Sequence, residues 1–108
     1  MIPKKLKLGA FTFTVKTDAT ALLKESERLA SNLYGATNYQ NLQIVVHPDV
    51  APMQMKDTLL HEVLHTCFHD YPELSNEDEE SMIRFVTPRL LDALRSNPRF
   101  VEFLTEAA

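Results

Sequence analysis

Residues 57–70, DTLLHEVLHTCFHD, decide the fold because their apolar residues have the most regular spacing in the chain. The apolar residues of this segment recur every three or four positions, which is typical of one face of a helix. They are Leu59, Leu60, Val63, Leu64, Cys67 and Phe68. The helical period begins near Met53, and Tyr71-Pro72 ends it because the residue before a proline avoids the helical region. The sequence therefore predicts one amphipathic helix in the middle of the chain.

The polar side of this predicted helix carries the pattern His61-Glu62-Val63-Leu64-His65. Residues four apart on a helix differ by about 40° in direction, so both imidazoles leave the same face and can bind one metal ion. This His-Glu-x-x-His spacing is typical of zinc metalloproteases. Glu62 lies about 100° from His61, beside the expected ion, where it can take the proton of a zinc-bound water and pass it to the leaving amine. We expect one Zn²⁺, with His61 and His65 as ligands and Glu62 as the general base.

The alternative is an amphipathic helix with histidines exposed on its surface. Average residue usage makes this five-residue pattern an event of well under about one per cent in a chain this short. The two histidines also lie opposite the apolar stripe of the same helix, so packing would anchor one side and present the ligands on the other. Both observations favour metal binding.

The third ligand has one candidate within the same segment, His69. It lies about 12 Å along the helix axis from His61, too far for one straight helix to chelate through all three histidines. The extended metzincin pattern is excluded, since it needs Gly and His where this chain has Phe68 and Tyr71. His69 is better explained as a residue that lines the cleft, binds substrate or ends the helix.

A stronger candidate lies in the acidic segment that follows. Residues 75–78, SNED, form a capping signal for a second helix to about Ser96. Glu79 projects near the middle of that helix's apolar stripe, where a carboxylate is costly unless a positive group receives it. Glu80 lies at the margin of the stripe and is the next choice. The alternative is that these acids are solvated and lie in the first turn because the helix dipole favours negative charge there. This explains the positions of Glu77 and Asp78 well and that of Glu79 poorly.

Two pairs of strands are predicted elsewhere in the chain. Apolar and polar residues alternate in the first pair, around a tight turn at Gly9-Ala10. The second pair is a hairpin of residues 33–37 and 42–46, with a polar turn at Asn38 to Asn41. A further helix is predicted after a cap at Asp18, over residues 20–32, and a short last helix from Arg99 to Glu106. No repeat or linker divides the chain, so residues 1–108 are expected to form a single domain.

The composition excludes several function classes. The 108 residues are 44% hydrophobic and 24% charged with a net charge of -4, which gives no reason to expect nucleic-acid binding. No apolar run has membrane-spanning length, and the N-terminus lacks a hydrophobic leader segment. Cys67 is the single cysteine, so no intrachain disulfide forms. We expect a cytoplasmic protein in which Cys67 is a buried structural thiol.

Two stretches resemble a known family. Residues 44–65, IVVHPDVAPMQMKDTLLHEVLH, resemble the core of ImmA/IrrE-like metallopeptidases and of minimal single-domain gluzincins. Residues 75–98, SNEDEESMIRFVTPRLLDALRSNP, are similar to the C-terminal helix of small zincin-like proteins common in phages and prophages. The resemblance implies an α+β zincin-like fold, with a small, mainly antiparallel sheet of three or four strands packed on the His-Glu-x-x-His helix and a second C-terminal helix. It also implies that a downstream glutamate completes the site of His61 and His65.

The resemblance further implies how a substrate binds. An edge strand, expected here at residues 42–46, would take a peptide or protein substrate in extended form. Tyr71, His69 and Tyr39 are the candidates for the residue that stabilises the oxyanion. The leading functional hypothesis is a zinc-dependent, metalloendopeptidase-like hydrolase. The alternative is a non-catalytic zincin-fold module that binds metal and serves regulation or interaction.

Overall fold

The structure is a computed structural model that describes residues 1–29 and 33–107. It is an α+β fold that contains a four-stranded sheet and four helices in these ranges. In chain order the elements are β1 (Lys5–Leu8), β2 (Phe11–Thr17), α1 (Ala19–Leu29), β3 (Gly35–Asn38), β4 (Gln43–Val46), α2 (Pro52–Cys67), α3 (Asn76–Ser96) and α4 (Pro98–Thr105). All of the predicted helices and strands are present, with ends that differ by a few residues. The end of the predicted helix over residues 20–32 lies outside the described residues.

The sheet is mixed, with the strand order β1-β2-β4-β3. β1 pairs with β2 and β3 pairs with β4 in antiparallel fashion, whereas β2 and β4 are parallel. The parallel pair needs a long connection, and α1 together with β3 supplies it. The two predicted hairpins, one around Gly9-Ala10 and one over residues 33–37 and 42–46, are therefore confirmed as the antiparallel pairs 5–8 with 11–17 and 35–38 with 43–46. The two hairpins join through the parallel contact of β2 with β4.

The expectation that residues 42–46 form an edge strand is wrong. β4 lies between β2 and β3, and β3 is the strand at that end of the sheet. The physical reason is visible in the side chains, because Ile44, Val45 and Val46 are all fully buried. Such a continuous apolar run fits a strand covered on both faces, inside a sheet.

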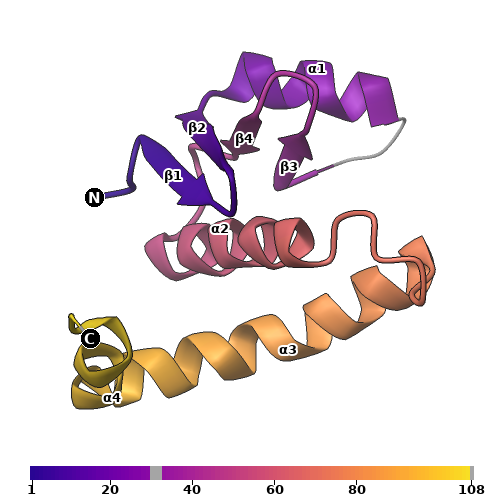
Figure 1. Cartoon of the computed structure of the whole chain (residues 1–108). Helices are drawn as coiled ribbons and strands as arrows, with labels where there is room; N and C mark the ends of the chain where they lie inside the picture. Colours follow the sequence, from indigo (N-terminus) through magenta and orange to yellow (C-terminus); the bar gives the residue numbers. More distant parts are fainter. Residues whose placement is uncertain (30–32, 108) are drawn as a thin grey trace.

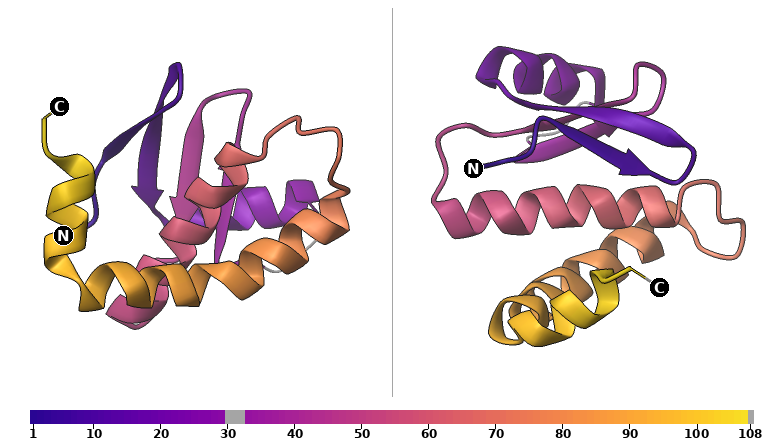
Figure 2. Two further views of the ribbon diagram at one scale, coloured as in Figure 1. Left: turned by 60° about the horizontal axis from the view of Figure 1, so that its bottom comes forward. Right: turned by 60° about the vertical axis from the view of Figure 1, so that its left-hand side comes forward.

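The elements form layers, with the sheet between α1 on one face and α2 on the other (Figure 1). Ile44 and Val46 join Phe13 in a core that Met55 and Leu59 of α2 cover. α3 lies on the far side of α2 and crosses it obliquely, and α4 follows at the distant end of α3 (Figure 2). The most buried side chain of α3 is Thr87 at 0% exposure, with Ile83 at 1%. This packing brings the start of α3 beside the end of α2.

Local signals fix where α2 and α3 begin and end. Pro52 opens α2 in its first turn, where the missing N–H is not needed. α2 ends at Cys67, and Asp70 then adopts a left-handed backbone with φ 62° that turns the chain. The hydroxyl of Ser75 accepts a hydrogen bond from the N–H of Asp78 at 3.1 Å, which confirms the predicted cap of α3.

Cys67 corrects one expectation of the sequence. It lies exposed in the last turn of α2, where its thiol donates a hydrogen bond to the carbonyl of Val63 at 3.6 Å. The prediction of a buried structural thiol is wrong, because an apolar pattern shows which side of a helix a residue takes but not how far the packing extends along the helix. Within residues 1–29 and 33–107, no helix combines the length and apolar character needed to span a membrane.

Candidate metal centre

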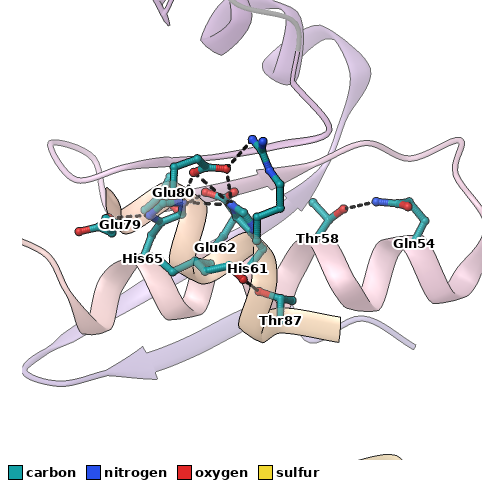
Figure 3. Close-up of polar contacts among 11 residues, drawn as sticks. Gln54, Thr58, His61, Glu62, His65, Glu79, Glu80 and Thr87 are labelled. Atoms are coloured by element: carbon teal, nitrogen blue, oxygen red, sulfur yellow. Dashed lines mark hydrogen bonds and ion pairs between the residues drawn. The ribbon is translucent and has the colours of Figure 1, made fainter. Parts of the chain in front are cut away.

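Three ligand atoms from α2 and α3 converge at the centre of the site (Figure 3). Nε2 of His65 lies 3.1 Å from Nε2 of His61 and 2.7 Å from Oε2 of Glu80. Nε2 of His61 lies 3.1 Å from Oε1 and 3.4 Å from Oε2 of the same carboxylate. Each residue can offer one such atom, and the three atoms all lie within 4.8 Å of one another. The histidines therefore share a face of α2, as their spacing predicts, and α3 brings a carboxylate to that face.

The three residues fit a zinc ion in chemistry and in size. Two imidazole nitrogens and one carboxylate oxygen are a ligand set that catalytic zinc uses, leaving a fourth position open. Tetrahedral bonds of about 2.0–2.1 Å would place neighbouring ligand atoms about 3.3 Å apart. The distances of 2.7, 3.1 and 3.4 Å among Nε2 of His61, Nε2 of His65 and Oε2 of Glu80 bracket that value. Only small side-chain shifts separate this arrangement from a tetrahedral site.

Glu79, the sequence's first choice for third ligand, takes a different place. Its Oε2 lies 2.6 Å from Nδ1 of His65, on the side of the ring away from His61 and Glu80. A carboxylate only accepts hydrogen bonds, so Nδ1 carries the proton in this contact. Nε2 is then the nitrogen that can offer its lone pair to a metal. The geometry thus favours Glu80, the second choice, as third ligand and makes Glu79 the residue that orients His65.

The ionisation of these groups reflects a site that attracts positive charge. Burial alone would lower the pKa of His65, but the hydrogen bond to Glu79 and the nearby charges of Glu62 and Glu80 raise it above its ordinary value. Burial opposes ionisation of Glu80, yet the two histidines hold the pKa of its carboxyl below the usual range. The acidic surroundings that favour a proton on His65 favour a metal cation in the same way.

Glu62 lies beside this group and is almost completely buried, with 8% exposure. Thr37 of β3 donates a hydrogen bond from Oγ1 to Oε1 of Glu62 at 2.8 Å. Burial raises the pKa of the Glu62 carboxyl, and the bond from Thr37 and the histidine charges only partly offset this effect. Gly35 permits the close approach, because a Cβ there would lie 2.5 Å from Cγ2 of Thr58 and 3.5 Å from Cγ of Glu62. The edge strand β3 therefore holds and desolvates Glu62.

A cavity of about 900 Å³ opens over the metal-ligand group. Its walls come from β3 and the turn after it, from α2, from the connection between α2 and α3 and from the start of α3. They include the three candidates for oxyanion stabilisation, Tyr39, His69 and Tyr71. His69 is not part of the ligand group and stacks on Tyr39 with ring centroids 3.7 Å apart and planes within 10°. Burial and nearby acids raise the pKa of Tyr39 to about 12, so its phenol stays protonated. His69 lines the cleft as expected, and the oxyanion role remains a prediction for these residues.

No sequence signal pointed to Thr37, because a threonine in a strand is common and its partner Glu62 lies 25 residues away. Arg84 pairs with the acidic start of α3, since its Nη2 donates to Oε1 of Glu80 at 3.1 Å. Arg89 instead bonds the carbonyl of Phe85 and covers that ring.

The chain matches no protein-family model, and the comparisons with curated proteins and with solved structures found no match. The residues of the site, their distances and their burial therefore carry the functional interpretation.

Proposed function

We propose that this protein is a zinc-dependent peptidase with a zincin-like site. The observation that carries the proposal is the convergence of His61, His65 and Glu80 within 4.8 Å, with the buried carboxyl of Glu62 beside them. A structural metal site needs ligands alone. A buried, hydrogen-bonded glutamate next to the ligands is costly to fold, and proton transfer gives it a use.

His61, His65 and Glu80 would hold the ion, with Glu79 fixing the ring of His65. A zinc ion, when bound, supplies a Lewis acid that polarises a carbonyl and makes water acidic. Glu62 accepts a proton at its carboxylate and later delivers it to the nitrogen of the leaving amine. Because Thr37 engages Oε1, we assign the proton transfer to Oε2. The raised pKa of Glu62 suits this task, since a general base works best when its pKa approaches the working pH.

The outer edge of β3, the last strand of the sheet in the described part of the chain, supports an extended peptide as the substrate. It takes the place of the segment 42–46 expected from the sequence. His47 donates its backbone N–H to the carbonyl of Tyr34 at 2.7 Å, so this is a hydrogen-bonded pair of the antiparallel ladder. Pairs alternate along such a ladder, and the backbone groups of Gly35 and Thr37 therefore point away from β4. Both residues line the cavity. A peptide strand can add there by backbone hydrogen bonds, passing over the ligand group.

The proposal is tested with zinc-loaded wild type and a Glu62→Gln variant, incubated with a broad peptide library and analysed by mass spectrometry. Gln keeps the shape of the side chain and an acceptor for Thr37 but cannot take the proton. General-base catalysis contributes about 10²–10⁴-fold, so cleavage should fall by about that factor while zinc content stays the same. Glu77→Gln, an exposed acid in the first turn of α3 that does not line the cavity, is the matched control.

Two results would oppose the proposal. If purified wild type takes up no zinc, the metal centre is wrong. If wild type and Glu62→Gln both hold zinc and cleave equally little, the peptidase is wrong and the non-catalytic metal-binding module takes its place.

A further inference from the structure

The two oxygens of the Glu80 carboxylate have different partners. Oε2 lies 2.7 Å from Nε2 of His65, whereas Oε1 accepts the hydrogen bond from Nη2 of Arg84 at 3.1 Å. His61 lies between them, with Nε2 3.1 Å from Oε1 and 3.4 Å from Oε2. The last torsion of a glutamate is broad, so a carboxylate without such a partner turns readily and can present either oxygen or both. Arg84 therefore distinguishes two otherwise equivalent atoms.

This ion pair has little to contribute to folding. The side chain of Arg84 is 76% exposed and that of Glu80 is 39% exposed, and ion pairs between side chains this exposed to water contribute little to stability. The pair is also one helical turn apart on α3, where the guanidinium reaches the carboxylate without strain. Its effect is on the direction of the carboxylate rather than on stability.

We propose that Arg84 is a positioning residue of the metal centre, which holds Oε1 of Glu80 so that Oε2 alone is presented to the ion. The inference rests on the metal centre proposed above and adds to it how Glu80 binds. A carboxylate that binds through one oxygen keeps a coordination position open, which a catalytic site needs. A carboxylate that binds through both oxygens fills that position.

Electrostatics alone predicts the opposite effect of removing Arg84, which makes the proposal testable. A guanidinium near the site repels a metal cation, so its loss should tighten metal binding if charge were its only influence. If Arg84 positions Glu80, its loss should weaken metal binding. The Glu80 carboxylate would then be ordered only when the metal binds, and the free energy cost of this ordering would reduce the affinity. Groups that orient metal ligands typically contribute about 10- to 100-fold to affinity. The high exposure of Arg84 places the expected effect near tenfold.

The experiment compares wild type with Arg84→Met, which removes both the charge and the donors, and Arg84→Lys, which keeps the charge and one compact donor. Zinc dissociation constants are measured by competition with a chelator, and Co²⁺ is substituted to record its visible absorption. We expect Arg84→Met to bind zinc about tenfold more weakly, with Arg84→Lys in between. The Co²⁺ band of Arg84→Met should lose intensity, as it does when a second oxygen raises the coordination number from four to five. Arg89→Met is the matched control, since Arg89 contacts Phe85 instead of the carboxylate.

The inference is overturned if Arg84→Met binds zinc as tightly as Arg89→Met or more tightly, with an unchanged Co²⁺ spectrum. That result leaves the proposed function standing, because wild type would still bind zinc through His61, His65 and Glu80. If wild type itself binds neither zinc nor Co²⁺, the metal centre is wrong and the role of Arg84 is rejected with it. Circular dichroism of each variant confirms that α3 is intact.

Discussion

The two adjacent glutamates at the start of α3 can be separated by one pair of substitutions. Glu80→Gln removes a charged oxygen that lies 2.7 Å from Nε2 of His65, in the ligand group. Glu79→Gln removes the charge on the other side of the ring, but the amide oxygen of Gln still accepts the hydrogen bond from Nδ1, now 2.6 Å from Oε2. The structure therefore predicts a much larger loss of metal affinity at position 80 than at position 79.

The magnitudes follow from the two kinds of contact. Apparent zinc-binding free energies of about 10–16 kcal/mol over four ligands correspond to about 3 kcal/mol per ligand, or roughly two orders of magnitude in the dissociation constant. Exchanging a charged acceptor for a neutral one, with the hydrogen bond kept, costs about 1 kcal/mol, or about fivefold. We expect losses of about 100-fold for Glu80→Gln and about fivefold for Glu79→Gln.

Zinc titration in competition with a chelator at pH 7.5 measures both dissociation constants, with Glu77→Gln as the exposed control in the same turn. Thermal unfolding of each metal-free variant shows whether the fold is retained. The reasoning fails if Glu79→Gln loses as much affinity as Glu80→Gln or more. Glu79 would then be the ligand, as its position in the apolar stripe of α3 first indicated.

Three further predictions follow from the site and its surroundings. Thr37→Val removes the donor that stabilises the Glu62 carboxylate, so the pKa of Glu62 should rise further. The acidic limb of the pH–rate profile for peptide cleavage should then move to higher pH, and an unmoved limb would contradict the role of Thr37. Gly35→Ala places a Cβ 2.5 Å from Cγ2 of Thr58, and overpacking of this kind should lower the free energy of unfolding by about 1–3 kcal/mol, measured by urea denaturation. The pKa of His65 is raised in the folded, metal-free protein, so its stabilising contribution is complete below the unfolded pKa of about 6.5 and is lost as the pH rises through the folded value. The difference in unfolding free energy between metal-free wild type and His65→Gln should accordingly be larger at pH 6 than at pH 8, and an equal difference would show that the shift is absent.

Local features of this protein were readable from the sequence because they depend on neighbours along the chain. The turn at Gly9, with φ 63°, the cap at Ser75 and the proline at the start of α2 each act within a few residues. The shared direction of His61 and His65 is a property of helix geometry alone. These features made the helices, the hairpins and the histidine pair predictable.

The sheet order depended on tertiary structure. The alternation in residues 11–17 and the apolar run in residues 43–46 both favour strands, but neither pattern carries information about which strand is the neighbour. The parallel contact between β2 and β4 forms because α1 covers one face and lets the chain return beside β2, with β3 left at the edge. The strand that meets the cavity is therefore β3, a choice that no local pattern encodes.

Glu79 and Glu80 show the same contrast between what the local sequence determines and what the tertiary structure decides. The helical projection of α3 correctly made Glu79 more buried than Glu80, at 17% against 39% side-chain exposure. Burial did not decide which carboxylate meets both histidines, because successive residues on a helix differ by about 100° and the crossing of α3 over α2 selects between them. By itself the sequence determined His61, Glu62 and His65 as one face of a helix. Only the packing of α3 and β3 against that helix brought Glu80 to the histidines and Thr37 to Glu62, since contacts 15 and 25 residues apart are made by the fold and not by the local chain.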